Sequence, residues 1–231
     1  MFSPFIADHG IDRLRFRFAT EQAQDWYDPI KPYVLLEYQW LLQNVDLTGR
    51  AIDGGAHHGH YSVVLAHGGA HVMSVDPHPD NLAALALNME LNGVENFTAL
   101  QAAVWKENEK AWFSGETNGM VGGFTGVQVN GMKLNAIDPD ADVVKLDIEG
   151  AEYVVIPACL DDMQAHTWIV ECHLSSWRGH NWPGCNPGDL AYLFKAHDFR
   201  LDWVNRETMR VEPYLIGTEW KTHSTLIARR T

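Results

Sequence analysis

The chain has 231 residues and a formal net charge of −13, from 17 basic and 30 acidic side chains. The negative charge opposes binding to a phosphate backbone, so we expect no nucleic-acid partner. No apolar run approaches the ~20 residues that a membrane-spanning helix needs. Three cysteines without C-x-x-C spacing, and an N-terminus without signal-peptide character, favour a reduced, cytoplasmic location.

Residues 1–48 precede the first core strand and are predicted to form an N-terminal helical cap. Residues 14–18 alternate like a short strand, and apolar residues recur at helical spacing from Val34 to Val45. We expect this helix to pack on the edge of the main domain, with a structural role favoured over substrate binding. Trp26 and Tyr27, which precede it, are candidates to roof a cofactor pocket.

The region from Arg50 to Tyr61 is typical of a short strand, a glycine-rich turn and the start of a helix. Gly55 and Gly59 lack a Cβ, so the backbone can approach a ligand, and the helix directs free N–H groups into the turn. The dinucleotide pattern G-x-G-x-x-G fails at Ala56. An acid at Asp53 would repel a pyrophosphate and would suit a cationic ligand such as S-adenosylmethionine (SAM).

A second acid, Asp76, ends the next expected strand, 23 residues after Asp53. This spacing suits a carboxylate on a ribose diol, in SAM and in nicotinamide cofactors alike. The alternative, a helix-capping Asp53 in an unrelated turn, is disfavoured because both acids are correctly spaced. A third strand, 97–100, places Gln101 and Ala102 where an adenine edge would lie. The predicted cofactor-binding residues are Asp53, Gly55, Ala56, His57, Gly59, Tyr61, Asp76, Pro77, Gln101, Ala102 and Asp147.

Residues 105–135 interrupt the alternation of helices and strands and are predicted to form a small β insertion. Its expected strands, 111–114 and 126–129, flank the glycine-rich segment 115–123. So much glycine indicates a loop with a permissive backbone. Both a functional lid and a solvated hairpin tip are compatible with this composition.

Two further expected strands end in titratable side chains. Asp147 and Glu149 follow one strand, and Glu171 and His173 end the next. Ligands bind beyond the carboxyl ends of the strands in an open parallel sheet. We therefore expect these four groups to converge on one edge with the acids of the first two strands.

The stretch 175–184 is rich in aromatic and hydrogen-bonding side chains. It should cross above the strand ends before a helix that begins at Asn186, and strands 200–204 and 224–228 bring the expected count to seven. Its aromatic side chains would stack on a sugar ring or, alternatively, anchor the loop. The substrate-binding candidates are Trp177, Arg178, His180 and Trp182.

Two segments resemble signatures of the FkbM family of SAM-dependent methyltransferases. DGGAHHGHYS at 53–62 is similar to D-x-G-A-N-x-G-x-Y-S, with His57 in place of Asn, and KLDIEGAE at 145–152 is similar to K-x-D-x-E-G-A-E. The resemblance covers about residues 45–231. For residues 49–231 it implies an α/β class I methyltransferase (Rossmann-like) fold, with a mostly parallel seven-stranded sheet, helices on both faces and an antiparallel last strand. It also implies O-methylation of a hydroxyl, often on sugars or complex natural products.

A hydroxyl acceptor needs a base or a metal to remove its proton. Glu149 is the preferred base and His173 the second choice, while Asp147 is also placed to hold the cofactor's ammonium. The alternative for Glu149 is a helix-start residue that interacts with the helix dipole. By similarity to macrocin-type sugar methyltransferases, Asp147, Glu171 and His173 are a candidate magnesium set, although Cys172 stands where a second acid would help.

The sequence therefore predicts a SAM-dependent O-methyltransferase that acts on a hydroxyl of a small molecule or of a sugar or glycan. One alternative is a catalytically idle SAM-binding regulatory module, which only turnover would distinguish. A second is an NAD-dependent oxidoreductase, which the acid and alanine of the first turn disfavour. The sequence names neither the acceptor nor the oligomeric state.

Overall fold

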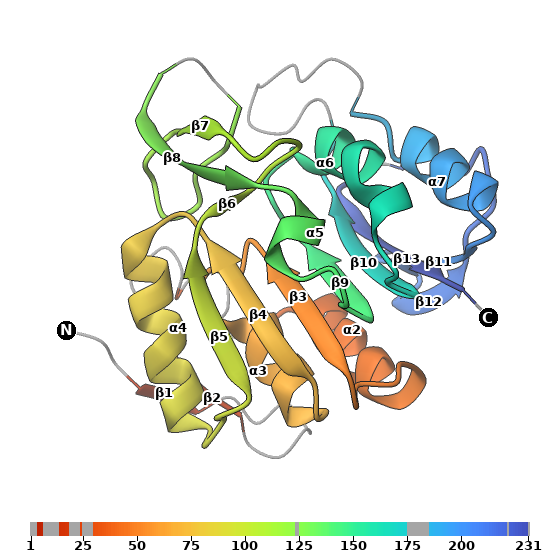
Figure 1. The fold of residues 1–231 in the computed structure, drawn as a ribbon. Coiled ribbons are helices and arrows are strands. Elements are labelled where there is room, and N and C mark those ends of the chain that lie inside the picture. The colour runs from red at the N-terminus through yellow and green to blue at the C-terminus, as the bar shows by residue number, and fades with distance from the viewer. Residues whose placement is uncertain are drawn as a thin grey trace.

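A mixed eight-stranded sheet organises the chain (Figure 1). The computed structural model describes residues 4–6, 14–18, 24, 30–122, 125–174, 185–220 and 222–230. In spatial order the strands are β12 (Arg210–Pro213), β11 (Arg200–Asn205), β13 (Ser224–Arg229), β10 (Thr167–Cys172), β9 (Val143–Leu146), β3 (Arg50–Gly54), β4 (His71–Asp76) and β5 (Phe97–Gln101). The five strands from β10 to β5 are parallel, and β13 runs antiparallel to both β10 and β11.

The predicted fold class is confirmed, but the predicted strand count is one too low. Strand β12 pairs antiparallel with β11 and adds an edge to the sheet. Its four residues are exposed or half-buried, so they carry no alternation of buried and exposed side chains. A strand of this kind forms because the chain folds back at 206–209, which local patterning does not reveal.

The central strands are buried on both faces because helices cover both. Helices α2 (Pro32–Asn44), α3 (His60–His67) and α4 (Pro79–Leu91) lie on one face, and α5 (Leu134–Ile137), α6 (Glu152–Cys159) and α7 (Pro187–Ala196) on the other (Figure 1). Two clusters of buried apolar residues form the core, one between the sheet and each of the two helix layers. The helix predicted to begin at Asn186 is confirmed, since the Asn186 side chain accepts the N–H of Gly188 at 3.0 Å.

The described part of the predicted cap contains a strand pair as well as helix α2. Strands β1 (Pro4–Ile6) and β2 (Arg15–Arg17) pair antiparallel, and two asparagines at the C-terminal end of α4 bind the backbone of β2. Asn92 accepts the N–H of Arg15 at 2.8 Å and donates to its carbonyl at 2.7 Å, and Asn88 donates to the carbonyl of Arg17 at 3.0 Å. The predicted roofing residues Trp26 and Tyr27 lie outside the described residues.

A small second sheet lies between β5 and α5, in the order β6 (Ala103–Val104), β8 (Val127–Met132) and β7 (Lys110–Phe113). Figure 1 shows it beyond the carboxyl ends of β4 and β5. The segment that joins β7 to β8 therefore reaches the edge of the main sheet at which the parallel strands end.

The turn between β3 and α3 lies directly against the turn that follows β9. A Cβ on Gly55 would stand 1.8 Å from the carbonyl oxygen of Asp147, and Gly55 has a φ of 75°. Only glycine combines this backbone conformation with so close an approach. The two turns can therefore pack together only because residue 55 is glycine.

Replacing Gly55 with Ala should destabilise the fold far more than replacing Gly93. Gly93 has a similar φ of 65° but nothing within 4 Å of its position for a Cβ, so Gly93→Ala should cost only the backbone strain, about 1–3 kcal/mol. Gly55→Ala adds a clash between two backbones. Urea unfolding of both variants measures the difference, and equal losses would contradict the packing described.

Candidate functional site

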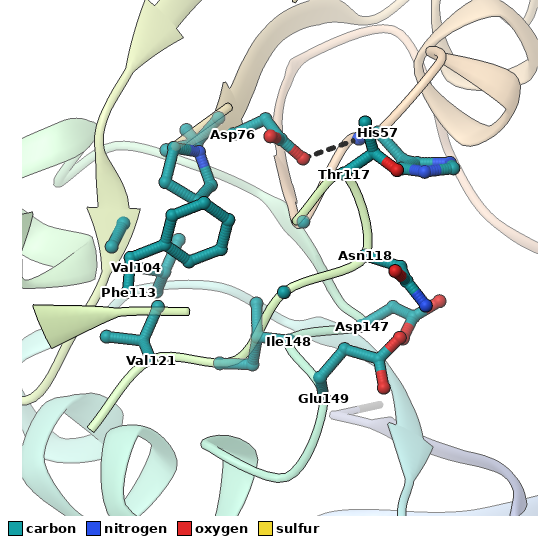
Figure 2. Close-up of a pocket in the computed structure, with 15 residues that line it drawn as sticks. His57, Asp76, Val104, Phe113, Thr117, Asn118, Val121, Asp147, Ile148 and Glu149 are labelled. Carbon is teal, nitrogen blue, oxygen red and sulfur yellow. Dashed lines mark hydrogen bonds between the residues drawn. The ribbon is translucent and has the colours of Figure 1, made fainter. Parts of the chain in front are cut away.

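Two adjoining cavities open where the parallel strands end, and both are lined by Gly55, His57, Asp147 and Glu149. The first, here the strand-end cavity, has a volume of about 600 Å³ and lies between the β3–α3 turn, the end of β4 and the β7–β8 segment (Figure 2). The second, here the α2 cavity, has about 1180 Å³ and lies between the same turn and helix α2. The shared wall makes them two compartments of one site.

Asp76 presents a buried carboxylate to the strand-end cavity. It accepts the backbone N–H of His57 at 2.9 Å (Figure 2), the backbone N–H of His78 at 2.8 Å and the side-chain amide of Asn81 at 3.0 Å. Burial raises the pKa of Asp76 to about 6, and these hydrogen bonds oppose the increase. The carboxylate is thus fixed in place with lone pairs available to hydroxyl donors.

The rest of the strand-end cavity is largely apolar. Its walls include Val75, Pro77, Ala103, Val104, Phe113, Val121 and Ile148. Neither of the predicted adenine-edge residues, Gln101 and Ala102, lines this cavity. Gln101 lines a neighbouring cavity and Ala102 is buried in the core. The N–H of Ala102 bonds to the carbonyl of Leu100 at 3.1 Å, and this bend turns the next two residues toward the cavity instead.

The glycine-rich segment between β7 and β8 contributes to this wall. Thr117, Asn118 and Gly119 line the strand-end cavity, and Asn81 donates to the carbonyl of Thr117 at 2.6 Å. The same Asn81 amide also binds Asp76. The segment is therefore tied to the cavity's carboxylate, which favours the lid interpretation over a solvated hairpin tip.

The other predicted turn residues divide between the cavities and the interior. Ala56 and Tyr61 line the α2 cavity, whereas Gly59 packs against Leu85. Asp53 is fully buried and stands in the described wall of neither cavity. It accepts the hydroxyl of Ser62 at 2.6 Å, and one of its oxygens lies 3.6 Å from the Lys145 ammonium. The predicted contact between Asp53 and a cationic cofactor is therefore not one that this geometry offers.

Lys145 is the cation that Asp53 neutralises. Its ammonium also lies 3.7 Å from Asp147 and 4.6 Å from the centre of the Tyr61 ring. Burial lowers the pKa of Lys145, but Asp147 and Asp53 more than compensate and raise it. The buried lysine thus stays charged and connects the glycine turn to the end of β9.

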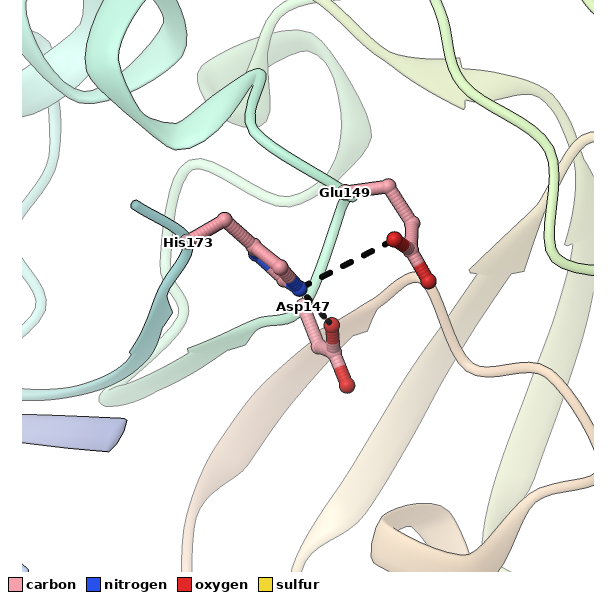
Figure 3. Close-up of side chains that lie close together, drawn as sticks. All are labelled: Asp147, Glu149 and His173. Atoms are coloured by element: carbon pink, nitrogen blue, oxygen red, sulfur yellow. Dashed lines mark ion pairs between the residues drawn. The ribbon is translucent and has the colours of Figure 1, made fainter. Parts of the chain in front are cut away.

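Asp147, Glu149 and His173 form the centre of the shared region (Figure 3). The His173 Nε2 atom lies 3.7 Å from Asp147 and 3.8 Å from Glu149, and its Nδ1 lies 3.2 Å from buried Glu152. Burial lowers the pKa of His173, but the surrounding carboxylates, with Glu152 foremost, raise it to about 10. A raised pKa keeps His173 protonated at neutral pH, which disfavours it as the second-choice base, and Glu149 remains the preferred candidate.

Glu149 has an unusual backbone for a residue with a side chain. Its φ is 56°, in the left-handed region that favours glycine. Such conformations persist where the surroundings over-determine them, and they cluster at functional sites. The turn after β9 thereby places the Glu149 carboxylate beside His173, as Figure 3 shows, and Glu149 lines both cavities.

The predicted magnesium set of Asp147, Glu171 and His173 does not form. Glu171 lines the α2 cavity but pairs with Arg206 at 3.1 Å and lies 3.8 Å from His223. The described residues that could together hold a metal ion are Asp147, Glu149 and His173, whose ligand atoms lie within 4.8 Å of one another. Binding a metal there would require His173 to release its proton.

Glu37 is a site residue that the sequence analysis missed. It lies on α2, is 5% exposed and lines the α2 cavity, where it accepts hydrogen bonds from the hydroxyls of Tyr61 and, at 2.7 Å, Thr225. Burial, together with the field of Glu171, raises the pKa of Glu37 to about 7. A signal was present, since an acid three residues after Val34 interrupts the apolar face of a helix.

The four substrate-binding candidates, Trp177, Arg178, His180 and Trp182, lie outside the described residues. Their contact with an acceptor therefore stays a prediction. Helix α2 supplies the described wall on the side of the α2 cavity away from the strand ends. None of the described helices is long and apolar enough to cross a membrane.

The sheet order, the glycine turn and the cavity at the strand ends define a class I SAM-dependent methyltransferase fold. Solved structures similar to the chain include a putative transferase from Pyrococcus horikoshii (13% identity, 98% of this chain and 70% of that chain, TM-score 0.54). A second is magnesium protoporphyrin IX methyltransferase from Synechocystis PCC 6803 with bound SAM (14% identity, 86% of this chain and 79% of that chain, TM-score 0.52). A third is a putative rRNA-methylase from Clostridium thermocellum (10% identity, 87% of this chain and 96% of that chain, TM-score 0.54).

The methyltransferase FkbM domain matches residues 53–208, so the chain belongs to the FkbM methyltransferase family. The protein is therefore a SAM-dependent methyltransferase, and the oxidoreductase alternative is overturned. No curated protein matches the sequence. Helix α2 and β13, which hold Glu37 and Thr225, lie outside the matched residues.

Replacing Glu37 with Gln should flatten the pH dependence of stability. The pKa of Glu37 in the folded state, about 7, lies above its ordinary value of 4.5, so the folded protein binds this proton more tightly. Stability is therefore highest below the unfolded-state pKa and falls as pH rises through the folded-state pKa, by up to about 3 kcal/mol. Glu37→Gln removes this loss.

The measurement is urea unfolding of the wild type and Glu37→Gln at about pH 5 and about pH 8, the two sides of the titration. Exposed Glu90, on α4, provides the control variant Glu90→Gln. If the wild type and Glu37→Gln lose the same stability between the two pH values, Glu37 titrates normally and the interpretation is wrong.

Proposed function

We propose that this protein transfers the methyl group of SAM to a hydroxyl of a small molecule or sugar-type acceptor bound in the α2 cavity. The observation that carries the proposal is the pair of adjoining cavities with Asp147 and Glu149 in their common wall. An idle binding module would need only the first cavity. A second, larger cavity lined by buried titratable groups supports an enzyme.

The strand-end cavity fits the cofactor by its chemistry. The fixed carboxylate of Asp76 suits the two hydroxyls of a ribose, and the apolar wall with Pro77 and Phe113 suits an adenine ring. Gly55 also lines this cavity, where its turn packs on the carbonyl of Asp147. When bound, SAM supplies an electrophilic methyl group on a sulfonium.

The residues of the shared wall perform the remaining chemistry. Glu149 is placed to accept the proton that the acceptor hydroxyl would release when its oxygen takes up the methyl group. The neighbouring imidazolium of His173 and the ammonium of Lys145 hold Asp147 and orient this wall. Positioning of the hydroxyl in line with the methyl group accounts for much of the expected rate.

The charge of the molecule favours a small acceptor over a nucleic acid. The chain carries a net charge of −13, and Glu37 and Glu171 line the acceptor side of the site. A phosphate backbone would be repelled by both. One structurally similar protein is described as a putative rRNA-methylase, but a likeness at 10% identity concerns the fold alone.

Replacing Asp76 with Asn should weaken SAM binding by about 1–3 kcal/mol, because charge-assisted hydrogen bonds to the ribose are lost. Calorimetry with SAM, its demethylated product and NAD measures this. Asp80→Asn, an exposed position on α4, is the matched control and should bind SAM like the wild type. Micromolar binding of NAD with no response to SAM would contradict the assignment of the cavity.

Replacing Glu149 with Gln should reduce turnover by about 100-fold or more and leave SAM affinity nearly unchanged, because the amide cannot accept the proton. Turnover is measured with an acceptor from a methyl-transfer screen across sugar, polyketide and lipid hydroxyls. Glu90→Gln again serves as the control. Full activity of Glu149→Gln would remove the base assignment while leaving the methyltransferase intact.

A further inference from the structure

We propose that the α2 cavity recognises a positively charged amine on the acceptor through Glu37 and Glu171, so that the acceptor is an amino alcohol, such as an amino sugar. This inference rests on the proposed function, because it names the substrate class of the same site.

Acids exceed cations on the side that an acceptor can reach. Two buried cations, Lys145 and His173, lie in the wall, but each is also held by a buried acid that does not line the described cavity. Asp53 lies 3.6 Å from Lys145, and Glu152 lies 3.2 Å from His173. The carboxylates that do face the cavity are Glu37, Asp147, Glu149 and Glu171.

The remaining basic residues do not reverse this excess. Arg206 neutralises Glu171 at 3.1 Å, and Lys31 lines the cavity from a partly exposed position. Burial lowers the pKa of His223 to about 4 and holds the pKa of His57 well below its usual range, so both line the wall as neutral rings. The described wall therefore keeps net negative charge.

Among the described residues of the wall, Glu37 is the buried carboxylate that most clearly lacks a cationic partner. Its hydrogen bonds come from the neutral hydroxyls of Tyr61 and Thr225, and among the described residues no basic group lies within 4.0 Å of it. Burial and the field of Glu171 raise the pKa of Glu37, and the field of Arg206 opposes part of this increase. An ammonium bound close to both acids would stabilise each as a carboxylate.

Two aromatic rings of the wall already lie against cations of the protein itself. The ring of Tyr61 lies 4.6 Å from the Lys145 ammonium, and the ring of Tyr33 lies 3.8 Å from the Arg206 guanidinium. These contacts show that aromatic rings and carboxylates in this wall accommodate positive charge. A phosphorylated acceptor would meet this wall with the same sign of charge and be repelled.

The amine and the methylated hydroxyl occupy different parts of the site. Glu37 and Glu171 line only the α2 cavity, whereas Asp147 and Glu149 line both cavities. An acceptor that places its ammonium at the first pair can present its hydroxyl at the second. A protonated amine has no lone pair, so the amine itself is not methylated while it is bound there.

Matched ligand pairs test the proposal without knowledge of the natural acceptor. The probes are glucosamine, galactosamine and ethanolamine, each paired with its N-acetyl derivative, titrated into protein saturated with S-adenosylhomocysteine. We expect at least one amine to bind about tenfold more tightly than its partner, the effect of one charge-assisted hydrogen bond. Glu37→Gln and Glu171→Gln should each reduce this preference, and Glu90→Gln should not.

Other outcomes would overturn the inference. Equal affinities within every pair would overturn it, and this includes the case in which neither member binds. Tighter binding of glucose 6-phosphate than of glucosamine would overturn it as well. Magnesium chloride alone is a further titrant: tight magnesium binding that abolishes the amine preference would assign the acids to a metal. Saturation with S-adenosylhomocysteine is measured first. Its failure would count against the proposed function, whereas normal saturation without an amine preference would overturn this inference alone.

Discussion

One buried cation, the ammonium of Lys145, sets the arrangement of the site. It lies in the middle of a buried strand, between Asp53 on β3 and Asp147 at the end of β9. An unpaired charge in this position would be strongly destabilising, so the lysine requires both acids and holds both strands in register. The Gly55 turn then packs on the Asp147 carbonyl, and the wall shared by the two cavities is complete.

The same lysine connects this wall to helix α2. The ring of Tyr61, in the first turn of α3, lies against the Lys145 ammonium, and the Tyr61 hydroxyl donates to Glu37. Thr225 on β13 binds the other oxygen of Glu37. Two segments outside the matched family domain thus meet beside the α2 cavity, and under the proposed function they would help to select the acceptor.

Histidines in this site show how surroundings decide charge. The Nδ1 atoms of His57 and His58 lie 2.7 Å apart, and desolvation lowers the pKa of both side chains, so they remain neutral. His173 is buried but faces Glu152 and Asp147, and its pKa rises to about 10. His57 and His58 in the glycine turn are therefore uncharged, whereas His173, which is distant in the sequence, carries a positive charge.

The amino-acid sequence by itself determined the glycine turn, the acids at the strand ends and the fold class, because these depend on local backbone freedom and on the rule that parallel strands end at one edge. Only the tertiary structure turned Asp53 toward Lys145 and added β12 to the sheet. It also placed Ala103 and Val104, and not Ala102, in the wall of the strand-end cavity. It also brought Glu37 to the site. Each of these depends on which distant segment packs against the residue, and a local pattern holds no information about that neighbour.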